Sequence, residues 1–373
     1  MSLALALPDR TIAPASEGVL DTIRTVVRRD LVPQVAAIDR EGVYPDAVMR
    51  SLGAAGAYRQ HLPGSTLGGP DLATTIAAIA AAGEHCLSTS FCMWCQSALA
   101  WYIWCSDNDA LKRKLGAGVA SGAVLGGTGL SNPMKTFFGI ETMRLKGTRV
   151  PGGYTVRGAL PWISNLGLDH WFGLVFARED GRPVMAVASC AADGVKLVDG
   201  GNFLALDGTR TYGVQFRDAF ISDDDILADP AEAYVKRIRG GFVLMQVGMG
   251  LGLARGCIRL IRDVEGPLGH VNKFLDVQAS DLEAQVDALD DEALDLATHV
   301  FDADPKIWRR IVAARLAASE LAVESAHQAM LHCGARGYVV TGEAQRRLRE
   351  AYFVAIVTPA SKQLKKMLAE MPA

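Results

Sequence analysis

Hydrophobic residues recur along this chain with two different periods, and these divide it into three parts. In the first part they return every three or four positions, as in an amphipathic helix, which predicts helices over 17–40, 46–54, 71–83, 90–104 and 108–117. In the middle part, short apolar or alternating runs lie between Gly, Asp and Asn turns, as strands do, over 140–150, 154–156, 174–177, 183–189, 195–198 and 213–220. From Tyr234 the helical period returns, over 242–261, 281–301, 306–331, 343–357 and 361–371.

This order predicts an α+β protein with an N-terminal all-α domain over 1–121, a small antiparallel β domain over 122–228 and a C-terminal helical bundle over 229–373. In the β domain, Arg157-Gly158 breaks the strand that begins at Tyr154, so we expect a β-hairpin whose second strand ends at Trp162. In the bundle, Gly266–Gly269 is expected to end the long apolar helix.

Composition and charge exclude several classes of protein. Half of the chain (50%) is hydrophobic, 21% is charged and the net charge is −3, with no basic stripe for nucleic acid. The apolar run Leu72–Ala82 is too short to cross a bilayer, and the N-terminus lacks the basic region of a secretory signal. We therefore expect a cytoplasmic protein with neither a nucleic-acid nor a membrane partner.

Seven cysteines, an odd number in a long chain, argue against a disulfide framework. Cys92 and Cys95 have C-x-x-C spacing, but no second pair and no His-x-x-x-His follow at zinc-site spacing. Their neighbours form an apolar and aromatic run, so we expect buried packing and no metal.

Five motifs, in order, resemble segments of the acyl-CoA dehydrogenase superfamily of flavoproteins. The most specific is Pro161-Trp-Ile-Ser-Asn165, which is similar to the family's Trp-Ile-Thr/Ser-Asn and follows Thr128 at the right spacing. The others are Tyr44-Pro45, His61-Leu-Pro-Gly64 with Gly68-Gly69, Gly208-Thr-Arg210 with Val214-Gln-Phe-Arg-Asp218, and Gly334-Ala-Arg-Gly-Tyr338 followed by Arg349-Glu-Ala351. The resemblance implies that the C-terminal bundle has four helices.

The resemblance also implies a flavin, FAD or alternatively FMN. Trp162 would lie against the flavin ring, with Ile163 and Ser164 at its N5 edge. The pyrimidine side would be bordered by Leu125, Gly127 and Thr128, and Ser131 would lie near the phosphates or the substrate carbonyl. The glycine loop with Gly334 and Ala335 would meet the flavin of a neighbouring subunit, which implies a homo-oligomer, a dimer or a tetramer.

Two departures concern catalysis. Counting from Arg349-Glu-Ala351 places Thr358 where the family has its catalytic glutamate, and a threonine hydroxyl is no general base at neutral pH. Some relatives carry the base on the helix that opens the C-terminal domain, but Gly241–Gly250 contains no carboxylate.

Two further departures concern the cofactor. Gly269–Phe274 replaces the family's Arg-x-x-Phe-Gly, so Lys273 or His270 would stand in for the arginine. The family's Glu-Pro-x-x-Gly-Ser is shortened to Gly129-Leu-Ser131.

Three hypotheses follow. The first is an acyl-CoA dehydrogenase-type enzyme that oxidises the Cα–Cβ bond of an acyl thioester and passes electrons to a partner protein; Asp218 or Glu350 would be its base, although both also fit structural carboxylates. The second is a flavin monooxygenase that hydroxylates or N-oxidises a small molecule and is supplied by a flavin reductase. The third is a non-catalytic homologue. The aromatic run Phe91–Cys105 either lines a substrate pocket or packs in the core.

Overall fold

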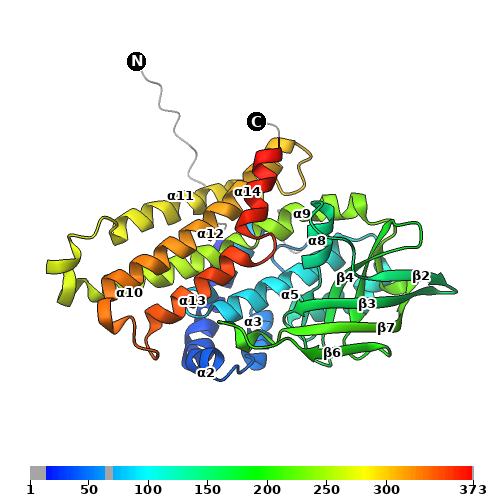
Figure 1. Ribbon diagram of the computed structural model, residues 1–373, viewed down its shortest axis with the longest axis horizontal. Helices are drawn as coiled ribbons and strands as arrows, with labels where there is room; N and C mark the ends of the chain where they lie inside the picture. The colour runs from blue at the N-terminus through cyan, green and yellow to red at the C-terminus, as the bar shows by residue number, and fades with distance from the viewer. Residues whose placement is uncertain (1–13, 64–69, 372–373) are drawn as a thin grey trace, which may run out of the picture.

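The computed structural model describes residues 14–63 and 70–371, so the predicted Gly64 and Gly68-Gly69 segment lies outside the described residues. Figure 1 shows an elongated molecule with long helices at one end and a β-sheet at the other. The helical end contains α10 (Val247–Asn272), α11 (Ala279–Ala297) and α12 (Pro305–Cys333). Helix α5 (Leu87–Cys105) runs between the helices and the sheet, so the two ends share one central element.

The N-terminal part is helical as predicted. The predicted helix over 17–40 is a continuous helical run in four pieces, with Pro33 in its 3-10 turn. Asp46 is the first residue of the next helix and pairs with Arg50 (2.9 Å). The elements are α1 (Pro14–Val26), η1 (Val27–Leu31), η2 (Val32–Gln34), α2 (Val35–Arg40), α3 (Asp46–Ala54), α4 (Leu72–Gly83), α5, α6 (Asp109–Leu111), η3 (Lys112–Gly116) and α7 (Ala117–Ser121).

The middle part forms one mostly antiparallel sheet in the order β6-β7-β3-β2-β4-β5-β8, and β1 pairs with β4 in parallel. Its strands are β1 (Gly126–Thr128), β2 (Lys146–Val150), β3 (Gly153–Ile163), β4 (Trp171–Ala177), β5 (Pro183–Ser189), β6 (Val195–Asp199), β7 (Tyr212–Ser222) and β8 (Ile226–Ala228). The connections contain α8 (Ser131–Phe137), η4 (Asp207–Thr209) and η5 (Asp223–Asp225).

Two predictions for this part are wrong. Strand β3 runs unbroken from Gly153 to Ile163, so Arg157-Gly158 is a bulge rather than the turn of a hairpin. Gly158 has φ 128°, and a Cβ there would lie 2.4 Å from the Arg144 carbonyl oxygen, so only glycine fits this bulge. The strand predicted over 140–150 begins only at Lys146, and helix α8 was not predicted.

The C-terminal part contains α9 (Glu232–Leu244), α10, α11, α12, η6 (Gly334–Arg336), α13 (Glu343–Ile356) and α14 (Ser361–Glu370). The long apolar helix is interrupted at Met245-Gln246 and continues through Pro267 to Asn272, so Gly266–Gly269 does not end it. Within the described residues, Glu232–Asn272 is the one helical span long and apolar enough to cross a membrane. Its most apolar window is 94% buried, as in a core helix of a globular protein.

Candidate active site

Trp162, at the end of strand β3, is exposed to solvent in a backbone conformation that few residues adopt. Its φ is 54°, in the left-handed region, and 63% of the residue is exposed. The indole Nε1 donates to the Gly200 carbonyl (3.1 Å), and the ring meets Phe203 edge-on at 6.3 Å. A left-handed backbone at a bulky residue is costly and persists only where the surroundings impose it. The sheet therefore holds a flat aromatic face outward.

Asn165, three residues after Trp162, anchors the chain beyond the end of β3. It is fully buried and also left-handed (φ 62°), which asparagine tolerates. Its side-chain oxygen accepts from Tyr44 Oη (2.6 Å), and its Nδ2 donates to the Gly126 carbonyl (2.6 Å). Its backbone N–H donates to Thr209 (2.8 Å), and its carbonyl lies 3.0 Å from His170 Nδ1. The bend is thus fixed from the helical domain, from β1 and from the loop before β7.

Three hydroxyls beside Trp162 form a chain with a defined direction. Thr209 donates its proton to the Leu206 carbonyl (2.7 Å). Since each hydroxyl has one proton, Thr211 must donate to Thr209 (2.8 Å) and Ser164 to Thr211 (2.6 Å). Ser164 Oγ therefore has lone pairs but no proton left for a ligand. It can accept a hydrogen bond from an N–H group.

Strand β1 approaches the same place through glycines. A Cβ on Gly127 would lie 2.2 Å from the Ser164 carbonyl oxygen, so the two segments can meet only because this residue has no side chain. Thr128 Oγ1 shares a hydrogen bond with Tyr102 Oη (2.8 Å). The side chains of Leu125 and Ile163 are buried, so a ligand could contact them only through their backbone. The structure thus brings Leu125, Gly127, Thr128, Ile163 and Ser164 together.

Ser131 and Thr358, 227 positions apart, join the sheet to the helical bundle. Their hydroxyl oxygens lie 2.9 Å apart at an exposed edge. Thr358 follows α13, and its carbonyl oxygen accepts from Gln246 Nε2 (3.0 Å), which is fully buried. Thr358, which the sequence comparison aligns with the family's usual base, is therefore paired with a second neutral hydroxyl.

A buried arginine lies behind this pair. Arg315 is fully buried, and its Nε donates to Gln246 Oε1 (2.6 Å). Its other nitrogens donate to Ser319 Oγ and to the Val354 carbonyl (2.7 Å). Burial lowers the pKa of Arg315 to about 9, so the guanidinium stays charged at neutral pH. All three acceptors are neutral.

Neither alternative carboxylate can serve as a base at this site. Glu350 is 2% exposed and pairs with Arg346 (2.8 Å) and Arg347 (3.1 Å). Asp218 pairs with Arg157 on the sheet surface, and that guanidinium lowers the pKa of Asp218. Arg157 precedes Trp162 by five positions along β3, a distance of about 17 Å in a strand.

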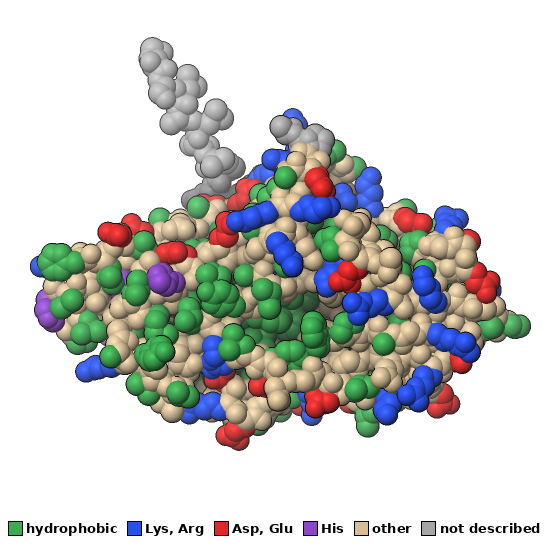
Figure 2. Space-filling model, in the orientation of Figure 1, with side chains coloured by type: hydrophobic (Ala, Val, Ile, Leu, Met, Phe, Trp, Pro, Cys, Tyr) green, Lys and Arg blue, Asp and Glu red, His purple; other side chains and the backbone are tan. Residues whose placement is uncertain are grey.

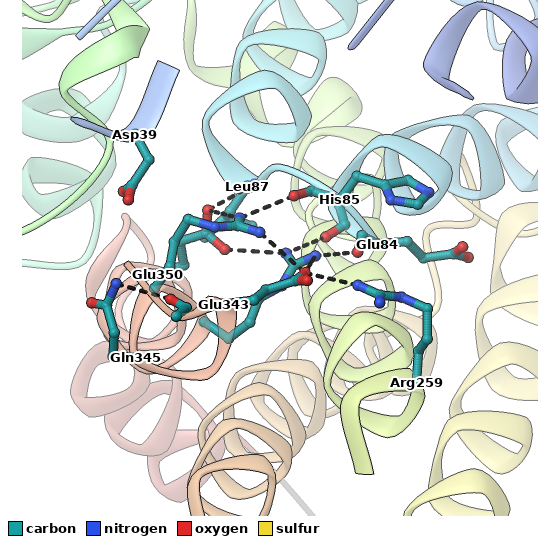
Figure 3. Close-up of polar contacts among 12 residues, drawn as sticks. Asp39, Glu84, His85, Leu87, Arg259, Glu343, Gln345 and Glu350 are labelled. Carbon is teal, nitrogen blue, oxygen red and sulfur yellow. Dashed lines mark hydrogen bonds and ion pairs between the residues drawn. The ribbon is translucent and has the colours of Figure 1, made fainter. Parts of the chain in front are cut away.

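Glu350 belongs to a charged cluster that anchors α13. Figure 3 shows Glu343 and Glu350 turned toward the backbone at the α4–α5 corner, Glu84 to Leu87. Arg347 donates to the Gly83 carbonyl (2.9 Å) and Arg346 to that of His85 (2.9 Å). Because α13 leads directly into Thr358, the cluster fixes one wall of the site.

The aromatic run on α5 packs in the core. Phe91 stacks on Trp94 (5.7 Å) and meets Phe353 of α13 edge-on (4.6 Å), and Trp94 contacts Phe242 (5.0 Å). Every residue from Leu87 to Ile103 is buried, including Cys92 and Cys95, and burial raises the pKa of both thiols. Among the described residues, no three His, Cys, Asp or Glu side chains group as metal ligands.

Figure 2 shows a hollow between the sheet and the helices, with hydrophobic side chains in and around it. The end of β3, the loop 200–206 and α13 meet there, because Trp162 bonds to Gly200 and Arg349 Nη1 donates to the Leu204 carbonyl (3.0 Å). Tyr352 and Ile356 of α13 are 51% and 66% exposed. The loop 200–206 therefore links the end of β3, with its exposed Trp162, to α13, which also exposes apolar side chains.

Gly334 and Ala335 are not part of this assembly. They are exposed on η6, and α13, a helix about 21 Å long, separates their loop from Thr358. An exposed apolar patch surrounds the loop. It joins the ends of α10 and α12, which Asn272 links through the His332 carbonyl (3.0 Å), and consists of Val271, Phe274, Leu331, Tyr338, Val339 and Val340.

Sequence reasoning placed Asn165 and Tyr44 in motifs without predicting that they contact each other, and it did not find Gln246 or Arg315. Arg315 carried one signal, since it stands alone in the run Ala313-Ala-Arg-Leu-Ala-Ala318. A single charge in such a run on a helix is typical of a buried, hydrogen-bonded group.

Comparison with known proteins shows which sequences and folds this chain resembles. Residues 14–123 match the N-terminal domain of acyl-CoA dehydrogenases. The chain is 24% identical over 377 residues to benzylmalonyl-CoA dehydrogenase of Aromatoleum aromaticum, covering 97% of this chain and 99% of that protein. Butyryl-CoA dehydrogenase from Megasphaera elsdenii has the same fold, with a TM-score of 0.85, 17% identity and coverage of 97% and 98%. So does dibenzothiophene monooxygenase from Paenibacillus sp. A11-2, with a TM-score of 0.80, 16% identity and coverage of 95% and 98%.

Proposed function

Because this chain belongs to the acyl-CoA dehydrogenase superfamily of flavin-dependent oxidoreductases, we propose that it binds FAD beside Trp162 and acts on an apolar small molecule. The observation that carries this proposal is the exposed indole, held in a left-handed conformation at the end of β3. Trp162 would stack on the flavin ring. A bound flavin supplies the transfer of electrons between substrate and acceptor.

The residues of the site fit the flavin ring. Backbone groups of Leu125, Gly127 and Ile163 and the Thr128 hydroxyl would border it, and Ser131 would lie toward its tail or the substrate. Ser164 Oγ can only accept, as the direction of its hydroxyl chain requires. It therefore suits the reduced ring, whose N5 carries a hydrogen, better than the oxidised ring. FMN remains the alternative cofactor.

The reaction must proceed without a carboxylate base at either family position. Thr358 occupies one, Gly241–Gly250 contains none, and Glu350 and Asp218 are held in ion pairs. Oxygenation of a substrate by reduced flavin needs no carboxylate to remove an α-proton. Hydroxylation or N-oxidation is accordingly the reaction that this geometry supports best.

The second candidate is dehydrogenation of an acyl thioester. It is supported by full-length similarity to benzylmalonyl-CoA dehydrogenase and to the short-chain specific acyl-CoA dehydrogenase of Homo sapiens. In that case an acyl-CoA would be the substrate and an electron-transfer protein the acceptor. A non-catalytic homologue is the third and least supported candidate, since the residues that would face a flavin, Trp162 and Ser164 among them, are present.

We further propose a homo-oligomer, a dimer or a tetramer, in which the loop with Gly334 and Ala335 meets the flavin of the neighbouring subunit. The exposed apolar patch around this loop supports that arrangement, since Tyr338, Val340 and Phe274 are each at least 80% exposed. Domain boundaries at 121/122 and 228/229 and a cytoplasmic location are part of the same proposal.

Anaerobic spectroscopy tests the proposal. The purified protein would be reconstituted with FAD or FMN and mixed with a panel of acyl-CoAs. Loss of flavin absorbance with any of them would refute oxygenation in favour of dehydrogenation. Oxygen consumption coupled to product formation from reduced flavin, with no bleaching by acyl-CoA, is the expected result. Failure to retain either flavin would overturn both candidates.

A further inference from the structure

The buried charge of Arg315 has no counter-charge. Among the described residues no carboxylate pairs with it, and its bonds go to Gln246, Ser319 and the Val354 carbonyl. A buried charge without an ionic partner is costly, so a protein that keeps one normally compensates it. Among the described residues, only neutral acceptors and backbone dipoles compensate this charge.

Part of the compensation is structural. Val354 lies in the last turn of α13, and carbonyl groups at a helix C-terminus carry partial negative charge. Arg315 thus caps α13 from inside the bundle. The helix terminus can compensate about half of an elementary charge. The remaining positive charge of Arg315 is compensated only by its other contacts.

One of those contacts leads to the surface. Gln246 accepts from Arg315 through Oε1, so its Nε2 must face the Thr358 carbonyl, where it donates (3.0 Å). Thr358 Oγ1 in turn meets Ser131 Oγ (2.9 Å) at an exposed position. Each hydroxyl has one proton, and one of the two is used in their mutual bond. Both hydroxyls could donate to an incoming acceptor once that bond opens. A carboxylate at Thr358 would bring a negative charge toward Arg315, with Gln246 between them, whereas the hydroxyl brings none.

We propose that the Ser131–Thr358 hydroxyl pair binds a carboxylate group of the substrate, with Gln246 and Arg315 as positioning residues behind it. The substrate class is therefore an apolar or aromatic carboxylic acid. Its apolar body would lie beside Trp162, and its anion would supply the missing counter-charge. That this anion is part of a substrate rests on the proposed function. That the site binds a carboxylate is independent of it.

Calorimetry with benzoate and its neutral isostere benzamide tests the site, on flavin-free and on reconstituted protein. We expect benzoate to bind at least tenfold more tightly than benzamide in both forms. Ser131→Ala and Thr358→Val should each weaken benzoate about fivefold and leave benzamide unchanged. Thr136→Val on the same helix α8, whose hydroxyl bonds only to the Asn132 carbonyl, is the matched control and should change neither.

The charge is tested separately. Thr358→Glu should abolish the preference for benzoate, because the new carboxylate would bring a negative charge toward Arg315. Arg315→Lys should keep the preference and Arg315→Gln should lose it; if either fails to fold, the hydroxyl variants decide. Equal binding of benzoate and benzamide, or a preference that survives both hydroxyl variants, would overturn the proposal. Benzoate binding to a protein that retains no flavin would sink the proposed function and leave the carboxylate site standing.

Discussion

Arg347→Met tests whether the charged cluster on α13 holds the helical domains together. Arg347 is fully buried and donates to the carbonyls of Gly83 and Glu84 and to Glu343 and Glu350. Methionine keeps most of the aliphatic stem and removes the charge and every donor. The change therefore isolates the polar contribution of the side chain.

The expected loss of unfolding free energy follows from the groups that Arg347→Met leaves without a partner. Removing one partner of a buried ion pair costs about 3–5 kcal/mol. Glu350 keeps Arg346 (2.8 Å) and the Leu87 N–H (3.3 Å), which places the loss of its pair with Arg347 near the lower limit. Two carbonyls at the end of α4 lose their donor as well, which adds about 1 kcal/mol or more. We expect a total loss of about 4 kcal/mol.

Urea unfolding monitored by circular dichroism measures this loss. Arg24→Met is the control, because the pair of Arg24 with Asp21 is exposed and should contribute less than about 1 kcal/mol. The double variant Arg347→Met/Glu350→Gln should be more stable than the sum of the single losses predicts, since the two residues share one ion pair. A loss for Arg347→Met no larger than that of the control would refute the reasoning.

Three further predictions concern the site and the core. Trp162→Ala should raise the dissociation constant for FAD about tenfold through lost stacking, measured by fluorescence titration; unchanged retention would contradict the stacking. Thr211→Val frees the Ser164 proton for the oxidised ring, so the flavin midpoint potential should fall by about 20 mV in a redox titration. Burial lowers the pKa of His61 to about 4, below the 6.5 of an exposed histidine, so its contribution is intact above pH 6.5. It should fall by about 3 kcal/mol as the pH drops to 4, and His61→Gln should remove this slope from pH-dependent unfolding.

The sequence was sufficient to predict the elements whose pattern is long and regular. Helices such as α12 and α13 bury one face along many turns, so their apolar residues recur every three or four positions. The Trp-Ile-Ser-Asn segment was also readable, because its residues depend on local backbone shape. The bulge at Gly158 was not, since an Arg-Gly pair serves a turn or a bulge equally well until the partner strand is known.

The other misses depend on tertiary contacts. Helix α10 continues through Pro267 although proline disfavours a helix interior; the helix as a whole packs against α12. The link from Arg315 through Gln246 to Thr358 joins three segments far apart in the chain. No local pattern encodes such a link; a lone arginine in an alanine-rich helix shows only that the charge must be satisfied somewhere.

The contacts that complete the site also order its formation in time. Tyr44 reaches Asn165 across 121 positions of the chain, and Ser131 reaches Thr358 across 227. Closing loops of this length is slow compared with forming helices, because the entropy of closure comes before the contacts that offset it. During refolding, helical signal should therefore return before flavin binding does. The rate of flavin binding during refolding would then measure the rate at which all three parts of the chain dock, the last step of folding.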